Sequence, residues 1–524
     1  MTTAEVKYSV AARLNRLPIT PTHRRVTFII GVGLFFEFYE FFLISVLTTS
    51  IAREFHISPK SPLISLLIAS TAIGMLFGTI GLNYLADRVG RRLAFMLNLG
   101  VYSLFSLLGA FSPNVYILII TRFLAGLGVG AELPLCDTYL SDMLPARSRG
   151  RYISWAYTLS FFGLPLLGFL ASLLVPRIPL GLSGWRWLFI IGAFGSAIVW
   201  LLRRGLPESP RWLESVGRRQ EAEEFVEQVE AEARKVTGSD TLPTPHAEEV
   251  PASAATPWRA MFQSQYRGRL IMLSVFHFFE PFSINGFGLL VPLILVAKGM
   301  TITNSLAYSA TSYIGYPLGS LLAALIVERL ERKWLLAITG VLMILFGIGF
   351  GFSTAANAIL LFGFAFAICS TIFGNAWHVY QGELFPTHAR ATASGLAYSA
   401  SRLSTALLPF ILVPVLYRSG AVAVFAIIGV ATLIAVADVV FFGPNTTGRP
   451  LELVNRVSDD YMKTESHQPA DSDDQRSSLV EKARPVAPTA SVRKPAHNQP
   501  QKNQSRSKKR GRKNRNKKRR NQRV

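Results

Sequence analysis

The chain has 524 residues, of which half are hydrophobic and 16% are charged, with a formal net charge of +22. Soluble domains usually carry about 25% charged residues, so this composition argues against a set of soluble globular domains. Two cysteines give neither a disulfide framework nor metal-ligand spacing. No nucleophile with a partner and no phosphate-binding loop stands out, so we expect no metal, no cofactor and no enzymatic activity.

Twelve apolar runs follow one another along the chain. A helix needs about 20 mostly apolar residues to cross a bilayer. The runs are too long for strands and lack two-residue alternation. They lie at roughly 26–50, 63–86, 93–112, 115–136, 152–175, 187–204, 269–297, 306–327, 334–354, 357–381, 391–417 and 420–443. The sequence therefore predicts an all-α integral membrane protein with twelve transmembrane helices, located in the plasma (inner) membrane.

Lys and Arg gather in the N-terminal arm and in the loops after the even-numbered runs, whereas the opposite loops carry few. Cytoplasmic loops are the ones enriched in these residues, so both termini are predicted to be cytoplasmic. The predicted parts are a cytoplasmic arm at 1–25, a six-helix bundle at 26–204, a cytoplasmic loop at 205–268 with a short helix, a second six-helix bundle at 269–443, and a cytoplasmic, largely disordered tail at 444–524.

The last 24 residues hold 13 Lys or Arg and no acidic residue. Beside a membrane, such a segment is attracted to anionic lipid headgroups by about 1 kcal/mol per basic residue. Residues 501–524 contain no aromatic side chain on which nucleic-acid bases could stack. We therefore expect this tail to contact membrane lipids rather than nucleic acid, and we take a monomer as the default oligomeric state.

The charged loops repeat at a fixed offset of 241 positions. Residues 87–92 read DRVGRR and residues 328–333 read ERLERK; residues 139–149 read YLSDMLPARSR and residues 380–390 read YQGELFPTHAR. A duplicated hydrophobic chain whose charges recur at matched positions predicts two pseudo-symmetric six-helix halves.

A few charged residues lie deep within the apolar runs. Glu37 and Glu40 are three residues apart, so they share a helical face. A carboxylate in hydrocarbon costs at least about 2.5 kcal/mol, so each must face the interior, find a partner or bind a proton. Arg122 lies about seven residues inside the fourth run, and Glu132 follows on the same helix. In the second half, His277 and Glu280 form another pair three residues apart, and His can relay protons near neutral pH.

Several motifs at the ends of these runs resemble those of the major facilitator superfamily, nearly end to end from about residue 26 to 454. They are LADRVGRR at 85–92, RFLAGLGVGAELP at 122–134, GWRW at 184–187, PESPRWL at 207–213 and GPNTTGRPLE at 443–452. The last three look like the sugar-porter and metabolite (organic-acid)–proton symporter branches. The seventh helix departs from sugar porters because it lacks their Gln-rich signature.

The resemblance implies a secondary active transporter that moves a small solute by alternating access. Acids of the first helix serve proton coupling in the symporters that the chain resembles, and the neighbouring first and fourth helices would let Arg122 pair with Glu37 or Glu40. The candidate proton-coupling residues are Glu37, Glu40, Arg122, Glu132, His277 and Glu280. The candidate substrate-binding residues are Arg122, Asn285, Asn375, Trp377, His378 and Arg402.

The resemblance implies proton symport, and two deep arginines and the missing sugar signature favour a small organic anion as the solute, such as an aromatic or short-chain carboxylate. A sugar or polyol carrier, an exporter and a transporter-like receptor without transport activity are the alternatives.

The repeated loop charges imply a cytoplasmic gate, in which ion pairs hold the halves together when the cavity faces outward. The other interpretation is that they only fix topology during insertion. Because acids recur along with bases, whereas topology needs only bases, we expect a gate. Its residues would be Asp87, Arg88, Arg91, Asp142, Arg149, Glu328, Arg329, Arg332, Glu383 and Arg390.

Overall fold

The computed structural model describes residues 8–245, 262, 264–327, 329–385 and 387–446, and every regular element in this part of the chain is a helix. Ten of these helical segments are long and apolar enough to cross a membrane. Two further crossings complete the predicted twelve. One is α13 (Ile302–Tyr313) together with α14 (Gly315–Ile326). The other arises because α17 (Thr387–Phe442) turns back at Gly420, whose φ of 80° suits a residue without a side chain.

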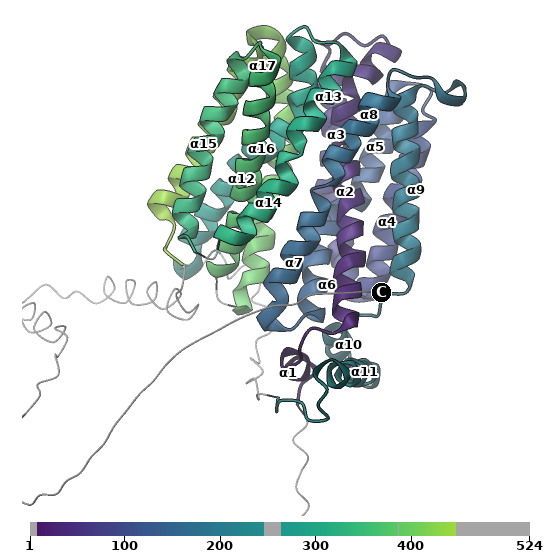
Figure 1. The fold of residues 1–524 in the computed structure, drawn as a ribbon, viewed down its shortest axis with the longest axis vertical. Coiled ribbons are helices and arrows are strands. Elements are labelled where there is room, and N and C mark those ends of the chain that lie inside the picture. The colour runs from purple at the N-terminus through teal and green to yellow at the C-terminus, as the bar shows by residue number, and fades with distance from the viewer. Residues whose placement is uncertain (1–7, 246–261, 263, 328, 386, 447–524) are drawn as a thin grey trace, which may run out of the picture. The chain divides into compact units, whose positions relative to one another are not determined.

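The helices fall into two sets of six crossings, which confirms the all-α, two-halved prediction (Figure 1). The first set is α2 (Pro21–Glu54), α3 (Pro62–Val89), α4 (Arg91–Ala110), α5 (Val115–Gly130), α6 (Glu132–Met143), α7 (Ala146–Ser160), α8 (Gly163–Leu174) and α9 (Gly184–Arg204), with the short 3-10 helix η1 (Pro179–Gly181) before α9. The second set is α12 (Ser264–Ala297), α13, α14, α15 (Arg332–Phe352), α16 (Ala356–Glu383) and α17.

Three crossings are broken in the middle, a feature that the apolar runs did not predict. The breaks separate α5 from α6, α7 from α8 and α13 from α14. In each case the second helix has a proline at its third position, where the missing N–H would have no intrahelical partner anyway. These prolines are Pro134, Pro165 and Pro317.

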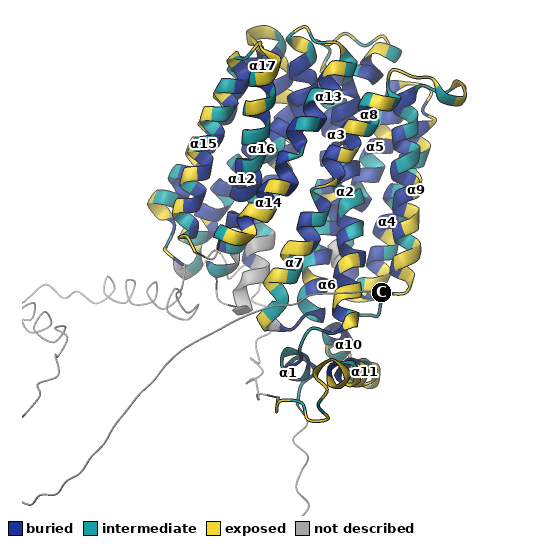
Figure 2. Ribbon diagram, in the orientation of Figure 1, coloured by how far each residue is buried: buried dark blue, intermediate teal, exposed yellow. Residues whose placement is uncertain are grey.

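Many residues on the outer faces of the helices are exposed, as Figure 2 shows for α4, α9 and α15, and leucine, isoleucine and phenylalanine are frequent among them. Leu104 is 53% exposed, Ile198 57% and Leu345 58%. An apolar surface of this extent belongs against lipid rather than water. The interior faces are packed as in a soluble protein, so the helices bury one side against each other and present the other to the bilayer.

The halves pack closely on the side away from the cytoplasm. There α8 packs against α13, α3 against α17 and α2 against α12. A Cβ added to Gly168 of α8 would lie 2.7 Å from Cβ of Ala310 in α13. A Cβ added to Gly288 of α12 would lie 2.7 Å from the ring of Phe42 in α2. These glycines let the backbones approach closely enough to close the extracellular side.

Three short helices form a cap beneath the cytoplasmic end of the first half (Figure 1). They are α1 (Val10–Asn15), α10 (Pro210–Ser215) and α11 (Arg219–Thr237), and α11 confirms the helix predicted within 205–268. Leu14 of α1, Trp212 of α10 and Val229 of α11 share one small hydrophobic core. The N-terminal arm is thus folded onto the loop that joins the two halves.

Ion pairs fasten α1 and the residue after it to α11. The Nη2 atoms of Arg13 and Arg16 lie 2.9 Å and 2.7 Å from the two carboxylate oxygens of Glu230. Burial raises the pKa of the Glu230 carboxyl, but the hydrogen bonds from Arg13 and Arg16 outweigh it, so the net pKa lies below the ordinary value. The contact therefore stabilises the cap wherever Glu230 is ionised.

A bulky side chain added at the extracellular contact between α8 and α13 should separate the two halves there. Gly168→Leu would place a side chain into the backbone of α13, and overpacking of this kind costs about 1–3 kcal/mol, which favours the outward-open arrangement by about five- to 150-fold. Spin labels at Leu180→Cys and Ala355→Cys, both exposed on the extracellular side, should report a longer distance. The native cysteines are buried. Gly268→Leu, exposed on α12 and with nothing within 4 Å of its added Cβ, is the control. An unchanged distance in Gly168→Leu would show that this contact does not hold the halves closed.

Removing the charge of Glu230 should loosen the N-terminal arm. Loss of charge-assisted hydrogen bonds of about 1.5–3 kcal/mol in Glu230→Gln predicts roughly tenfold to 150-fold faster amide exchange in residues 10–15. In the unaltered protein the same loosening should occur on acidification. Since the folded pKa is depressed, the contact is complete above the ordinary Glu value of about 4.3 and is lost as the pH falls below it. Hydrogen–deuterium exchange measures both effects.

The exposed Glu227→Gln on the same helix is the control for this experiment. Equal exchange rates in the two variants would contradict the role given to Glu230.

Candidate functional site

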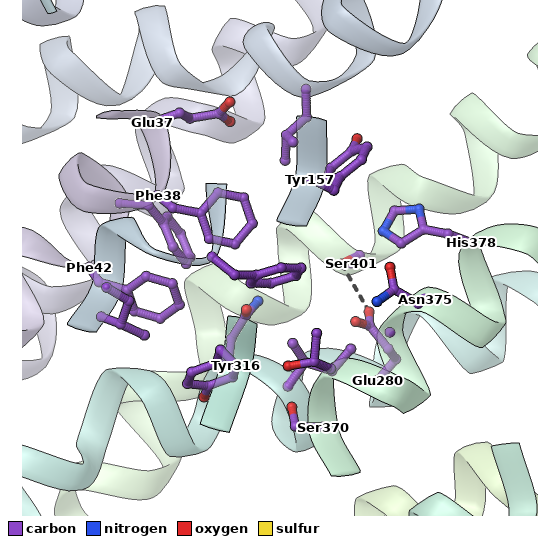
Figure 3. Close-up of a pocket in the computed structure, with 18 of the residues that line it drawn as sticks. Glu37, Phe38, Phe42, Tyr157, Glu280, Tyr316, Ser370, Asn375, His378 and Ser401 are labelled. Carbon is purple, nitrogen blue, oxygen red and sulfur yellow. Dashed lines mark hydrogen bonds between the residues drawn. The ribbon is translucent and has the colours of Figure 1, made fainter. Parts of the chain in front are cut away.

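A cavity of about 110 Å³ lies between the two halves, and Figure 3 shows its two unlike walls. The first half contributes mainly apolar side chains from α2, α7 and α8, among them Phe38, Phe41, Phe42, Phe161 and Leu164. The second half contributes most of the polar side chains from α12, α16 and α17, among them Glu280, Asn285, Asn375, His378 and Arg402. The cavity therefore suits a solute with an apolar face and a polar end.

Three charged residues face this cavity, namely Glu37 of α2, Glu280 of α12 and Arg402 of α17. The Arg402 guanidinium lies 4.9 Å from the centre of the Tyr398 ring and interacts electrostatically with both carboxyls. Ser401 donates a hydrogen bond of 3.4 Å to Glu280. Within the described chain, Nε and Nη2 of Arg402 and Oε2 of Glu37 are buried without a hydrogen-bond partner. Such atoms are costly unless a ligand or water satisfies them.

A second cavity, of about 580 Å³, lies on the cytoplasmic side and is called the vestibule here. It is bounded by α6, α7, α14 and α16, and includes Asp142 and Val327 near their cytoplasmic ends. Three residues, Tyr157, Asn375 and His378, line both the vestibule and the central cavity. With the extracellular side packed shut and the vestibule present, the structure faces inward.

The boundary between the two cavities is held by hydrogen bonds. The Tyr157 hydroxyl donates to Oδ1 of Asp137 over 2.8 Å. The Asn375 amide donates to the Ser320 hydroxyl over 3.4 Å. Ser320 is also 2.9 Å from the hydroxyl of Thr158, which joins α14 of the second half to α7 of the first. We call Tyr157, Asn375 and His378 the neck of the cavity.

Glu40 and Arg122 form a buried ion pair outside the cavity lining. Nη1 of Arg122 lies 2.5 Å from Oε1 of Glu40, and both side chains are 0% exposed. The guanidinium also lies over the Phe189 ring, 4.6 Å from its centre. Of the two acids predicted as partners of Arg122, the structure thus selects Glu40. Arg122, also predicted to bind substrate, is not among the cavity-lining residues.

A second buried pair joins Glu132 of α6 to Arg203 of α9, where Nη1 donates to Oε1. The Arg203 guanidinium lies over the Phe95 ring, 4.4 Å from its centre. It fits only because Gly33 of α2 has no side chain, since a Cβ there would lie 1.8 Å from Nη2. The sequence did not single out Arg203. Together with Arg204 it ends the sixth run, where basic residues are expected for topology alone.

The remaining predicted polar residues of the second half lie in or beside the cavity. His277 is buried behind the lining, with Nε2 3.2 Å from the Gln381 side-chain oxygen. Asn285 lines the cavity and donates to the Thr405 hydroxyl over 3.2 Å. Trp377 also lines it and stacks on His378 with ring centroids 4.0 Å apart. Tyr157 and Tyr316, which line it too, were not predicted because aromatic residues are too abundant to stand out.

The predicted gate residues lie at the cytoplasmic helix ends. Arg332 pairs with Glu383 over 3.4 Å within the second half. Asp142 accepts a hydrogen bond of 2.7 Å from Ser209, and Arg91 donates one of 3.0 Å to the Ala86 carbonyl. Arg88, Arg149 and Arg329 occupy the same ends. Glu328 and the side chains of Asp87 and Arg390 lie outside the described residues.

One contact at these ends was not predicted. Oε1 of Glu208 accepts hydrogen bonds from the backbone N–H groups of Arg91 and Arg92, at 2.9 Å and 3.2 Å. The carboxylate thereby satisfies the first turn of α4, where backbone donors have no intrahelical partners.

Two broken six-helix halves around a central cavity, all of it embedded in lipid-facing apolar surface, define a multi-pass membrane transporter rather than an enzyme. The sequence profile described as "Sugar (and other) transporter" matches residues 26–457, so the chain belongs to this family of the major facilitator superfamily. The predicted superfamily is confirmed.

Relatives agree with this assignment. The putative metabolite transport protein YyaJ of Bacillus subtilis is 33% identical over 84% of this chain and 97% of its own length. The niacin transporter NiaP of Acinetobacter baylyi is 29% identical over 85% of this chain and 99% of its own length. The partially occluded, inward-open structure of the xylose transporter XylE from E. coli superposes with a TM-score of 0.67 and 22% identity, over 81% of this chain and 99% of that one. This chain is therefore a membrane transporter of sugars or other metabolites.

The pair of Glu132 and Arg203 should be essential for stability. Arg203→Met leaves an uncompensated carboxylate in the bundle, which typically costs about 3–5 kcal/mol. We expect a clear fall in the melting temperature of the detergent-solubilised protein, measured by intrinsic fluorescence, and substantial recovery in Arg203→Met/Glu132→Gln. The exposed Arg151→Met should melt like the unaltered protein. A double variant no more stable than the single one would refute the pairing as the cause.

Proposed function

We propose that this transporter is a proton symporter for a small organic anion, an aromatic or short-chain carboxylate, and that it works by alternating access. One observation carries the proposal above the others. Arg402 presents two buried nitrogen atoms without hydrogen-bond partners to a cavity whose opposite wall is aromatic.

A carboxylate is the group that best satisfies such an arginine, because the planar guanidinium can donate two parallel hydrogen bonds to its two oxygens. The flat apolar part of the solute would then lie against Phe38, Phe42 and Phe161. A sugar could bond its hydroxyl groups to the polar wall, but it has no negative charge to pair with Arg402. The niacin transporter among the relatives supports this choice, since niacin is a pyridine carboxylate.

Proton coupling would follow because a bound carboxylate would compete with Glu37 and Glu280 for the positive charge of Arg402. In the empty cavity the positive charge of Arg402 acts on the carboxyls of both Glu37 and Glu280. A bound carboxylate would neutralise Arg402 and leave the two acids in an apolar cavity, where the protonated form is favoured. The anion and the proton would therefore enter together. Glu40 and Glu132 are committed to arginines, so we place the coupling role on Glu37 and Glu280.

The charged helix ends would complete the cycle. In this inward-facing structure Arg332 and Glu383 pair within one half. We infer that the predicted gate residues exchange such partners for ones across the interface when the vestibule closes, because partly desolvated ion pairs can stabilise either of two arrangements.

The proposal can be tested with purified protein in liposomes that contain a pH-sensitive dye. Pools of aromatic carboxylates, short-chain carboxylates, their neutral amides, sugars and amino acids are added outside. We expect inward acidification with one carboxylate pool and none with the matching amides. Protein-free liposomes correct for acids that cross the bilayer unaided. Acidification with sugars alone would refute the anion and favour a sugar symporter, and solute uptake without acidification would refute proton coupling.

Two variants should separate binding from coupling. Arg402→Gln loses charge-assisted hydrogen bonds of about 1.5–3 kcal/mol, so the half-saturating carboxylate concentration should rise about tenfold to 150-fold. Glu37→Gln stays neutral at every pH, so solute exchange should continue while dye acidification falls or stops. Radiolabelled exchange and dye signal are measured on the same liposomes. Unchanged acidification in both Glu37→Gln and Glu280→Gln would contradict the assigned coupling residues.

A further inference from the structure

We propose that the first half carries a binding site for the phosphate group of an anionic phospholipid of the cytoplasmic leaflet. The site lies where α11 of the cap covers the cytoplasmic ends of α2, α4 and α9. It is separate from the solute cavity and does not depend on which solute is transported.

The proposed phosphate site is a cavity of about 250 Å³ with three arginines in its lining. Arg25 comes from α2, Arg92 from α4 and Arg204 from α9, and Phe225 and Gln228 of α11 complete it. No Asp or Glu is among the described residues that line it. Three guanidinium groups from three helices with no carboxylate between them form an anion site by charge complementarity.

The arginines converge on one short stretch of backbone. Nη2 of Arg92 donates a hydrogen bond of 2.5 Å to the Arg204 carbonyl. Nη2 of Arg25 lies 3.3 Å from where a Cβ on Gly205 would be, so Gly205 leaves room for this guanidinium. None of the ion pairs formed by the described residues involves any of the three. Their remaining N–H groups stay available to an anion.

A larger cavity of about 760 Å³ shares Arg92, Arg204 and Phe225 with the phosphate site and extends along α4 and α9. Its lining there is apolar, with Leu93, Met96 and Trp200. Leu93 is 48% exposed on the lipid-facing surface. Arg204 lies over the Trp200 ring, 4.8 Å from its centre, as expected where a headgroup region meets acyl chains. A phospholipid would fill both parts, with its phosphate at the arginines and an acyl chain along the apolar lining. A soluble phosphate would contact only the arginines.

Three acids line the larger cavity, but two of them are already occupied. Glu221 pairs with Arg218 over 2.6 Å. Glu208 accepts the backbone N–H groups of α4. Glu224, the third acid, accepts a hydrogen bond of 3.1 Å from Gln220. The described linings of the two cavities together hold four arginines and three glutamates, so they carry a net charge of +1.

The site can be tested on the full-length protein by native mass spectrometry after equilibration in detergent with defined lipids. We expect the protein to retain phosphatidylglycerol in preference to phosphatidylcholine. The variant Arg25→Gln/Arg92→Gln/Arg204→Gln should retain at least tenfold less phosphatidylglycerol. The matched control is Arg24→Gln, an exposed neighbour on α2 that is not in the lining, and it should behave like the unaltered protein. The polybasic tail is present in every variant and cancels in the comparison.

Equal retention by the triple variant and the unaltered protein would overturn the site. Displacement of the lipid by soluble glycerol phosphate at the same concentration would also overturn it, because it would show a site for soluble phosphates. A second measurement does not need the triple variant, so it tests the site even if that variant fails to fold. Brominated phosphatidylglycerol should quench the fluorescence of the folded protein more than brominated phosphatidylcholine does, and Trp200→Phe should remove that difference. No difference between the two lipids would contradict the proposal.

Discussion

The cost of burying a charge in hydrocarbon organises the first half of this protein. Two arginines deep in the bundle, Arg122 and Arg203, each lie against an acid of another helix and over an aromatic ring. Removing either partner would leave an unpaired charge where water cannot reach it. These pairs hold α2, α5, α6 and α9 in register, and they leave Glu37 as the acid of α2 that faces the solute cavity. A first half made rigid by these pairs is a fixed body against which the second half can move.

The second half is built differently. Its interior arginine, Arg402, lines the cavity together with Glu280 and Glu37, and no ion pair within hydrogen-bond distance joins it to either acid in the described chain. The prolines that break the crossings lie beside this region. Phe161 and Leu164 flank the break before Pro165, and Tyr316 follows the break before Pro317, and all three line the cavity. The extracellular and cytoplasmic parts of these crossings can thus take different directions at the level of the solute.

Much of this architecture was predictable because bilayer thickness fixes the length of an apolar run, and the repeated loop charges revealed the two halves. The helix breaks could not be predicted, because a proline in the first turn of a new helix and one inside a continuous helix look alike in a sequence. Glu37 and Glu40 were placed on one face, yet residues three apart differ by about 60° around the axis. Because of this angle, Glu37 faces the cavity and Glu40 contacts Arg122. The partner of Glu132 required the fold itself, because Arg203 lies 71 residues away.

The neck formed by Tyr157, Asn375 and His378 sets the character of the exit toward the cytoplasm. These side chains touch the cavity on one side and the vestibule on the other, so the barrier is a single layer of side chains. Rotamer changes of exposed side chains take picoseconds to nanoseconds, whereas rocking of whole bundles takes about microseconds to milliseconds. In the proposed cycle, release from the inward-facing state would therefore require side-chain movements in the neck but no rocking of the bundles.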